Sequence, residues 1–176
     1  ATRIFHAYST MSPGDMAWHR ANHYDSIDSR QFTDEETAVS EAMRFKLAGG
    51  GTICDVTPLG IGRDPLGLAR IARATGLNIV MGAGYYREPA HPEGMDEKTE
   101  DQIAEEIVAD ITTGGGSTGI KSGIIGELGC SWPLTENERK VLRAGARAQR
   151  ETGASISIHP GWHEDEPFEI LDLLEE

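Results

Sequence analysis

The sequence has little of what marks several large protein classes. It contains two cysteines, Cys54 and Cys130, whose number and separation argue against a disulfide scaffold or a zinc knuckle and indicate a reduced, cytoplasmic compartment. No apolar run approaches the ~18 residues of a membrane span. Basic residues are not clustered and the formal net charge is -13. Nucleic acid and membranes are therefore not expected as partners.

A dinucleotide-binding fingerprint is also missing. Gly60-Ile61-Gly62 follows an apolar run but lacks the third glycine of the motif, so it is weak evidence for a nucleotide cofactor. What the sequence does contain is an alternation of apolar runs with helical patterns from residue 33 onward. Residues 1–32 are predicted to be an irregular loop region, with a candidate strand over residues 3–8, and residues 33–176 to form βα units of a single domain spanning 1–176.

Helix boundaries are signalled by local capping residues. Thr33 with Glu36, and Thr135 with Glu138, have the spacing of a capping box, and Asp64 precedes a proline at the first helical position. The helices expected from these signals and from apolar spacing cover 33–47, 65–75, 98–111, 135–152 and a segment from 166. The strands expected between them cover 52–56, 78–84, 119–128 and 154–159.

The expected strands are near-continuous apolar runs, which is typical of strands buried on both faces of a parallel sheet. An α/β fold follows, either a doubly wound sheet or a TIM (β/α)8 barrel. The weak glycine motif favours the barrel. Because a full barrel needs about 250 residues, the chain is expected to be about the first half of one, roughly strands 2–5 with their helices. A complete small α/β domain is the alternative.

Active sites of such barrels lie at the carboxyl ends of the strands. The polar residues at these ends are Asp55 with Thr57, Tyr85, Tyr86 and Arg87, Glu127, and His159. A carboxylate and an imidazole on neighbouring strands can converge on one divalent ion, and Glu127 and His159 are therefore the candidate metal ligands. By pattern alone, each is equally well explained as a strand-end residue with a structural hydrogen bond or salt bridge.

Long motifs in a fixed order resemble one known family. They are Gly51-Thr52-Ile53-Cys54-Asp55-Val56-Thr57, Thr118 through Gly129, Ala146 through Gly153 and Ser155 through His159. Over about residues 33–159 the chain resembles the phosphotriesterase-related proteins of the amidohydrolase superfamily. The resemblance implies a hydrolase with two divalent metal ions, expected to be zinc, with Glu127 as the bridging carboxylate, His159 as a ligand and Tyr86 lining the substrate pocket.

The chain also departs from this family. It has no His-x-His pair, which the family places on strand one, and the ligands of strands six and eight are not present. His19 and His23 are expected to be a solvated pair, His163 is not assigned to the metal, and Lys121 comes too early to be a bridging lysine. The isolated chain is therefore expected to be inactive.

The expected function is hydrolysis of a small ester, lactone, amide or phosphoester, and the glutamate at the bridge favours carbonyl substrates. A barrel without a metal site that binds small molecules or partners is the alternative, and a metal-free enzyme using Tyr86 and Lys121 is a weaker one. A homodimer is a possible assembly, because members of the family commonly dimerise. Structural roles are expected for Asp55 (loop hydrogen bonds), Arg63 (pairing with a carboxylate), both cysteines (buried) and Trp132 (packing at the rim).

Overall fold

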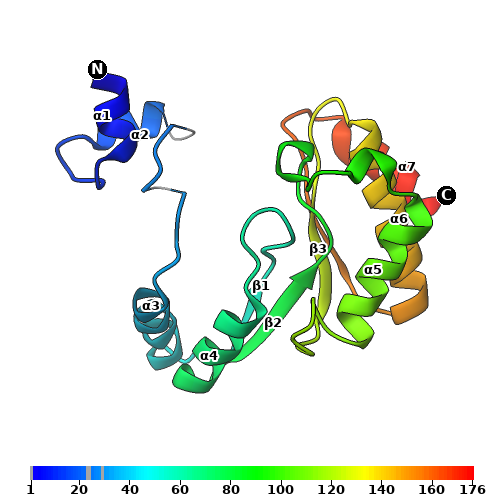
Figure 1. Ribbon diagram of the computed structural model, residues 1–176, viewed down its shortest axis with the longest axis horizontal. Helices are drawn as coiled ribbons and strands as arrows, with labels where there is room; N and C mark the ends of the chain where they lie inside the picture. Colours follow the sequence, from blue (N-terminus) through cyan, green and yellow to red (C-terminus); the bar gives the residue numbers. More distant parts are fainter. Residues whose placement is uncertain (1, 23–24, 29) are drawn as a thin grey trace. The chain divides into compact units, whose positions relative to one another are not determined.

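The structure is a computed structural model that describes residues 2–22, 25–28 and 30–176, with the side chains of residues 2–4 outside the description (Figure 1). Contacts within the chain divide it into two compact units, residues 1–45 and residues 46–176. Each unit is described separately. The single domain expected over 1–176, with a boundary at residue 32, stays a prediction.

The first unit contains two short helices, α1 (Thr2–Tyr8) and α2 (Met16–Ala21), and most of α3 (Glu35–Leu47). The prediction that residues 1–32 are irregular, with a strand over residues 3–8, was therefore wrong. The ring of Trp18 on α2 stacks on that of His6 on α1, with centroids 4.9 Å apart. This contact joins residues 12 positions apart, which a local pattern does not reveal.

His19 is buried, and its Nδ1 lies 2.9 Å from the Ser26 hydroxyl. The expectation of a solvated pair was wrong for His19, while His23 lies outside the described residues. The start of α3 also differs from the prediction. Asp34 accepts hydrogen bonds from the Glu36 amide (3.0 Å) and the Thr37 hydroxyl (2.7 Å), so a carboxylate one residue later takes the capping role expected of Thr33.

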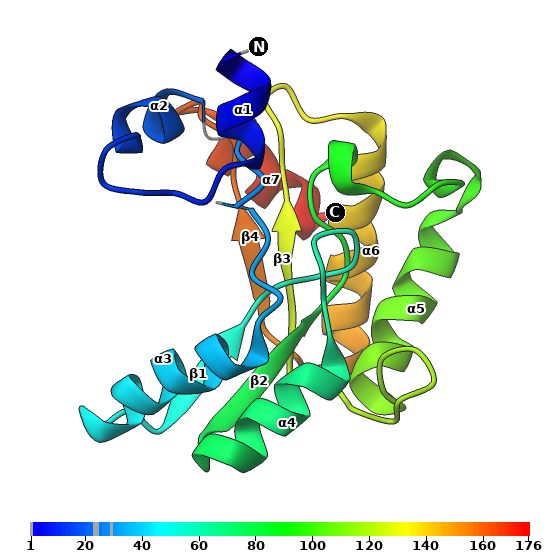
Figure 2. The same ribbon diagram turned by 60° about the vertical axis from the view of Figure 1, so that its left-hand side comes forward.

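The second unit is built on a parallel sheet with strand order β1-β2-β3-β4, as the apolar runs predicted. Its strands are β1 (Thr52–Asp55), β2 (Asn78–Ala83), β3 (Ile124–Gly129) and β4 (Ile156–His159). The helices are α4 (Pro65–Thr75), α5 (Glu100–Thr112), α6 (Glu136–Thr152) and α7 (Glu166–Glu175), with short 3₁₀ turns η1 (Glu88–Ala90) and η2 (Met95–Glu97). In Figures 1 and 2, α5 and α6 lie side by side against one face of the sheet.

Helices α4 and α6 begin and end where their capping residues predicted. Asp64 accepts from the Gly67 amide at 3.0 Å with Pro65 at the first helical position, and the Thr135–Glu138 capping box is complete. Gly76 and Gly153 end the two helices with φ of 66° and 72°, a left-handed conformation that side chains disfavour. These signals are local, and the sequence is therefore sufficient to show them.

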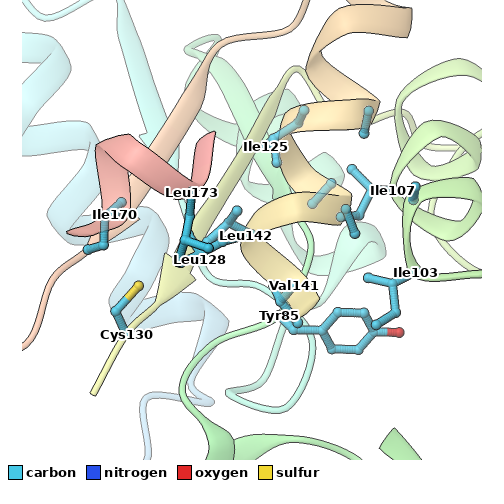
Figure 3. Close-up of a cluster of buried hydrophobic side chains, with 14 of the residues drawn as sticks. Tyr85, Ile103, Ile107, Ile125, Leu128, Cys130, Val141, Leu142, Ile170 and Leu173 are labelled. Atoms are coloured by element: carbon cyan, nitrogen blue, oxygen red, sulfur yellow. The ribbon is translucent and has the colours of Figure 1, made fainter. Parts of the chain in front are cut away.

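The hydrophobic core lies between the sheet and the helices α5, α6 and α7 (Figure 3). Leu128 of β3 is at its centre, fully buried beside Leu142 of α6 and Leu173 of α7. Gly145 of α6 lets the helix approach closely, because a Cβ there would stand 2.6 Å from Leu128 Cδ1. This packing fixes β3, and with it the strand end that carries Glu127.

Burial of the strands is uneven, which differs from the expectation of strands covered on both faces. Residues of β1 alternate between exposed and partly buried. The prediction that both cysteines are buried was wrong for Cys54, which is exposed on this strand, and is confirmed for Cys130. Strand β3 also begins later than expected: Ser122 is tied by its amide to the Asp110 carbonyl and by its hydroxyl to the Gly82 carbonyl. No helix in the described part of the chain has the length and apolar character needed to cross a membrane.

Candidate active site

Three of the predicted site residues meet at the carboxyl ends of the strands. His159 Nδ1 at the end of β4 lies 3.5 Å from Glu127 Oε1 on β3, and its Nε2 lies 3.0 Å from the hydroxyl of Tyr86, which follows β2. The side chains of His159 and Glu127 are 37% and 26% exposed, so both can be reached from solvent. The structure thus confirms that Glu127 and His159 converge, while their role as metal ligands stays a prediction.

A β-bulge directs Glu127 to this position. Ile125 pairs with Ile156 and Leu128 pairs with Ile158, so β3 has two residues where β4 has one. Such a bulge bends the strand and changes where its side chains point. Gly126 is needed within it, because its φ is 115° and a Cβ there would stand 2.1 Å from the Ser157 carbonyl oxygen. The glycine before Glu127 is therefore part of the reason the carboxylate faces His159.

Tyr86 is held in place by its backbone. His91 places Nε2 2.7 Å from the Tyr86 carbonyl oxygen, and the Gly129 amide donates to the Tyr85 carbonyl at 3.2 Å. A Cβ on Gly129 would stand 2.6 Å from the Tyr86 carbonyl carbon, so only glycine permits this approach of β3 to the segment after β2. Tyr85 is buried and its hydroxyl bonds to Glu106 of α5, so Tyr86 is the member of the pair that belongs to the site.

A buried carboxylate joins the two loops next to the site. Glu138 of α6 is fully buried, and it accepts hydrogen bonds from the backbone amides of Glu88 (3.1 Å), Ser131 (3.0 Å) and Thr135 (3.1 Å). Glu88 follows Tyr86 by two residues and Ser131 follows Glu127 by four. Because amides of both loops converge on one buried carboxyl group, this side chain fixes the spacing between the two loops.

Two further residues of α6 bind the same loop after β2. Lys140 Nζ donates to the carbonyls of Met95 (2.9 Å) and Lys98 (2.9 Å). The amide nitrogen of Asn137 lies 2.5 Å from an Asp96 carboxylate oxygen. The loop that carries Tyr86 is thus fastened to the first turns of α6.

The remaining polar residues near the sheet have structural roles, as expected. Arg63 pairs with Asp110, and both are largely buried. Asp55 accepts from the Thr57 amide at 3.0 Å, and Lys121 is exposed. Burial raises the pKa of the Cys130 thiol to about 12, with smaller contributions from nearby carboxylates. A thiol with so high a pKa is a poor nucleophile.

The pair formed by Glu127 and His159 fits a shared metal ion. Their separation is too long for a hydrogen bond. Two ligands that each lie roughly 2.1 Å from a zinc ion stand about 3.4 Å apart at a tetrahedral angle. The Tyr86 hydroxyl contacts Nε2, the other ring nitrogen of His159. A metal-bound histidine usually makes its orienting hydrogen bond through this second nitrogen. Among the described residues no group of three or more His, Cys, Asp or Glu could hold a metal, so a metal at this pair would need further ligands.

A parallel sheet in the order β1-β2-β3-β4, covered by helices and with polar side chains gathered at its carboxyl end, is the architecture of half a TIM-type (β/α)8 barrel. The chain belongs to the phosphotriesterase family, whose model matches residues 10–176. Among solved structures it is similar to a resiniferatoxin-binding protein from Rhodobacter sphaeroides (38% identity, TM-score 0.93), which aligns over 99% of this chain and 49% of that one.

Curated relatives are named as hydrolases. The chain is 43% identical to the N-acetyltaurine hydrolase of Xenopus tropicalis, over 92% of this chain and 47% of that protein, and 45% identical to that of Dictyostelium discoideum, over 90% and 43%. It also resembles an Escherichia coli phosphotriesterase homology protein whose structure is described as having phosphate in the active site (28% identity, TM-score 0.81, covering 88% and 53%). The chain spans about half the length of the curated relatives it matches.

Sequence reasoning missed two residues that hold the site in place. Glu138 was identified only as a helix-capping residue, and His91, which contacts the Tyr86 carbonyl, was not singled out. The capping spacing was a correct signal for Glu138 but showed only its contact with Thr135. The contact of Glu138 with Glu88, 50 positions away, has no local signature in the sequence.

Proposed function

We propose that the intact protein containing this chain is a metal-dependent hydrolase that cleaves a carbonyl substrate. The observation that carries the proposal is the 3.5 Å approach of His159 Nδ1 to Glu127 Oε1 at the carboxyl end of a parallel sheet. Glu127 is proposed to bridge two divalent ions, with zinc as the expected metal, and His159 to bind one of them. Divalent ions bound by these residues would supply an activated water and polarise the scissile carbonyl.

The residues of this chain have distinct parts in the proposed site. Glu127 and His159 would provide a carboxylate oxygen and an imidazole nitrogen as ligands, and Tyr86 would orient the imidazole through its contact with Nε2. We favour an amide or ester over a phosphotriester, because the bridge is a glutamate and because curated relatives are named for hydrolysing an N-acyl amide, N-acetyltaurine. N-Acetyltaurine is thus the first substrate to test, followed by a lactone and an aryl phosphotriester.

The test uses the intact protein and measures metal content and turnover together. Chelation should abolish hydrolysis, and added zinc should restore it. Glu127→Gln and His159→Asn should each lower kcat/KM by about 100-fold or more, because even partners of metal ligands affect activity about 10- to 100-fold. Tyr86→Phe should lower metal affinity by about 10-fold or more.

A matched control is His163→Asn. His163 is 41% exposed, stacks on Trp132 at 4.2 Å between centroids and follows His159 by four residues. This variant should keep its metal and its turnover. Full activity of the metal-free protein would overturn the proposed metal dependence. A preference for the phosphotriester would overturn the proposed substrate class.

A binding protein is the second candidate. It is favoured by one observation, the Rhodobacter neighbour that is named for binding resiniferatoxin and aligns at a TM-score of 0.93. An intact protein that holds no metal and hydrolyses none of the three substrates would support this candidate over the enzyme.

A further inference from the structure

Arg87, at the carboxyl end of β2, has an unusual environment. Its side chain is only partly exposed, and its Nε is buried without a hydrogen-bond acceptor. Within the part of the chain that the structure describes, the guanidinium forms no ion pair, and its one charge-related contact is with the ring of Tyr86, 5.7 Å from Cζ to the centroid. Leaving a buried donor without an acceptor is unfavourable.

Other partly buried cations of the same unit have acceptors. Arg63 pairs with Asp110, Lys98 with Glu106, and Arg139 with Glu169, and Lys140 donates to backbone carbonyls. The chain has 29 acidic residues and 16 Lys and Arg residues, so acidic partners are abundant. Although carboxylates outnumber cations, the guanidinium of Arg87 has no carboxylate partner among the described residues. We take this to indicate that its partner lies outside them.

The position of Arg87 is beside the candidate metal ligands. It follows Tyr86, whose hydroxyl lies 3.0 Å from His159 Nε2. Its stem passes over Gly129, where a Cβ would stand 2.8 Å from Arg87 Cγ, and Gly129 is the register partner of His159. The absence of a side chain at Gly129 therefore makes room for the arginine next to the proposed reaction centre.

We infer that Arg87 binds an oxyanion of the substrate, a carboxylate or sulfonate carried on the part of the molecule away from the scissile bond. This inference rests on the proposed hydrolase function and adds the charge class of its substrate. A guanidinium presents donors in a planar fork that matches two oxygens of such a group. Tyr86 lies against the guanidinium and also touches His159, so one tyrosine sets the position of the anion-binding group relative to the metal ligand.

The first experiment compares two amides that differ in charge, N-acetyl-β-alanine and the neutral N-propylacetamide, with the intact metal-loaded protein. Arg87→Met keeps the length that packs over Gly129 and removes the charge. It should lower kcat/KM for N-acetyl-β-alanine by about 10- to 100-fold, the usual worth of a charge-assisted hydrogen bond, and change the neutral amide by less than about threefold. Arg87→Lys should recover part of the loss.

Arg150→Met is the matched control, since Arg150 is an exposed arginine in the last turn of α6 and loses the same charge. This variant should leave the ratio of the kcat/KM values for the two amides unchanged. An equal loss on both amides in Arg87→Met, or no loss on either, would overturn the inference. A fall in melting temperature without a change in the substrate ratio would overturn it too, because it would identify an internal carboxylate as the partner.

A second readout does not depend on turnover. Propanesulfonate is titrated into the protein while the side-chain Nε–H resonance of Arg87 is followed by NMR and the affinity is measured by calorimetry. The resonance should shift, and affinity should fall by about 10-fold or more in Arg87→Met. Equal affinity in wild type and variant refutes the inference even if hydrolysis is observed. Absence of hydrolysis with Arg87-dependent binding refutes the proposed function alone.

Discussion

The perturbation with the most direct structural reasoning is removal of the buried carboxylate of Glu138. Three backbone amides, those of Glu88, Ser131 and Thr135, donate to it, at 3.0–3.1 Å. A buried N–H that loses its acceptor costs about 1–3 kcal/mol. Water can reach part of these loops, so Glu138→Ala is expected to lower the free energy of unfolding by about 3–5 kcal/mol rather than by the full sum.

Glu138→Gln should cost roughly half as much. The amide oxygen can still accept from Ser131 and Thr135, but the amide nitrogen then faces the Glu88 N–H, and two donors oppose each other. Glu136→Ala provides the control, because Glu136 is in the same first turn but is exposed. Its loss removes only a favourable charge at the helix N-terminus, worth about 0.3–1 kcal/mol.

The assay is denaturant unfolding of the intact protein combined with amide hydrogen exchange. The amides of Glu88, Ser131 and Thr135 should exchange faster in Glu138→Ala and at the wild-type rate in Glu136→Ala. If the Glu138→Ala and Glu136→Ala proteins lose the same free energy of unfolding, the reasoning is refuted, because the buried contacts would then contribute nothing beyond the helix dipole.

Three further predictions concern two other buried groups, Arg63 and Cys130. Arg63→Met leaves Asp110 buried without its cation and should lower the free energy of unfolding by about 3–5 kcal/mol in a denaturation experiment. Arg70→Met breaks an exposed pair and should lower it by less than about 1 kcal/mol. Similar losses in the two variants would contradict this ranking. Because burial raises the pKa of Cys130 to about 12, a thiol reagent at pH 8 should label exposed Cys54 quickly and Cys130 only on unfolding. Stability should fall as pH rises above the ordinary thiol value of 9.0, since the unfolded state then ionises first. Labelling of both thiols at one rate would contradict this account.

Much of the second unit could be predicted because its signals are local. Asp64, Gly76, Thr135 and Gly153 each act through residues within one turn, so the sequence shows where α4 and α6 begin and end. The parallel order of the strands follows from their apolar runs and the intervening helices. Strand β3 could not be located as well, because Ser122 is fixed by carbonyls of other elements that no periodic pattern displays.

The same division applies to the site. Glu127 and His159 were predictable as neighbours because carboxyl ends of parallel strands share one edge of the sheet. The bulge that orients Glu127 depends on how β3 pairs with the backbone of β4, and the presence of Gly126 alone does not predict it. Arg87 was visible at a strand end, but its lack of a carboxylate partner among the described residues appears only once the other ion pairs are placed.

The anchoring of the loop after β2 has a consequence for protein engineering. This loop is bound by Asn137, Glu138 and Lys140 of α6, and not only by α5, the helix that it leads into. A chimera that imports the loop from a relative without the opening turns of α6 would receive donors and acceptors that do not match. The transferable module for altering selectivity in this scaffold is therefore discontinuous in sequence, combining one loop with the start of a later helix.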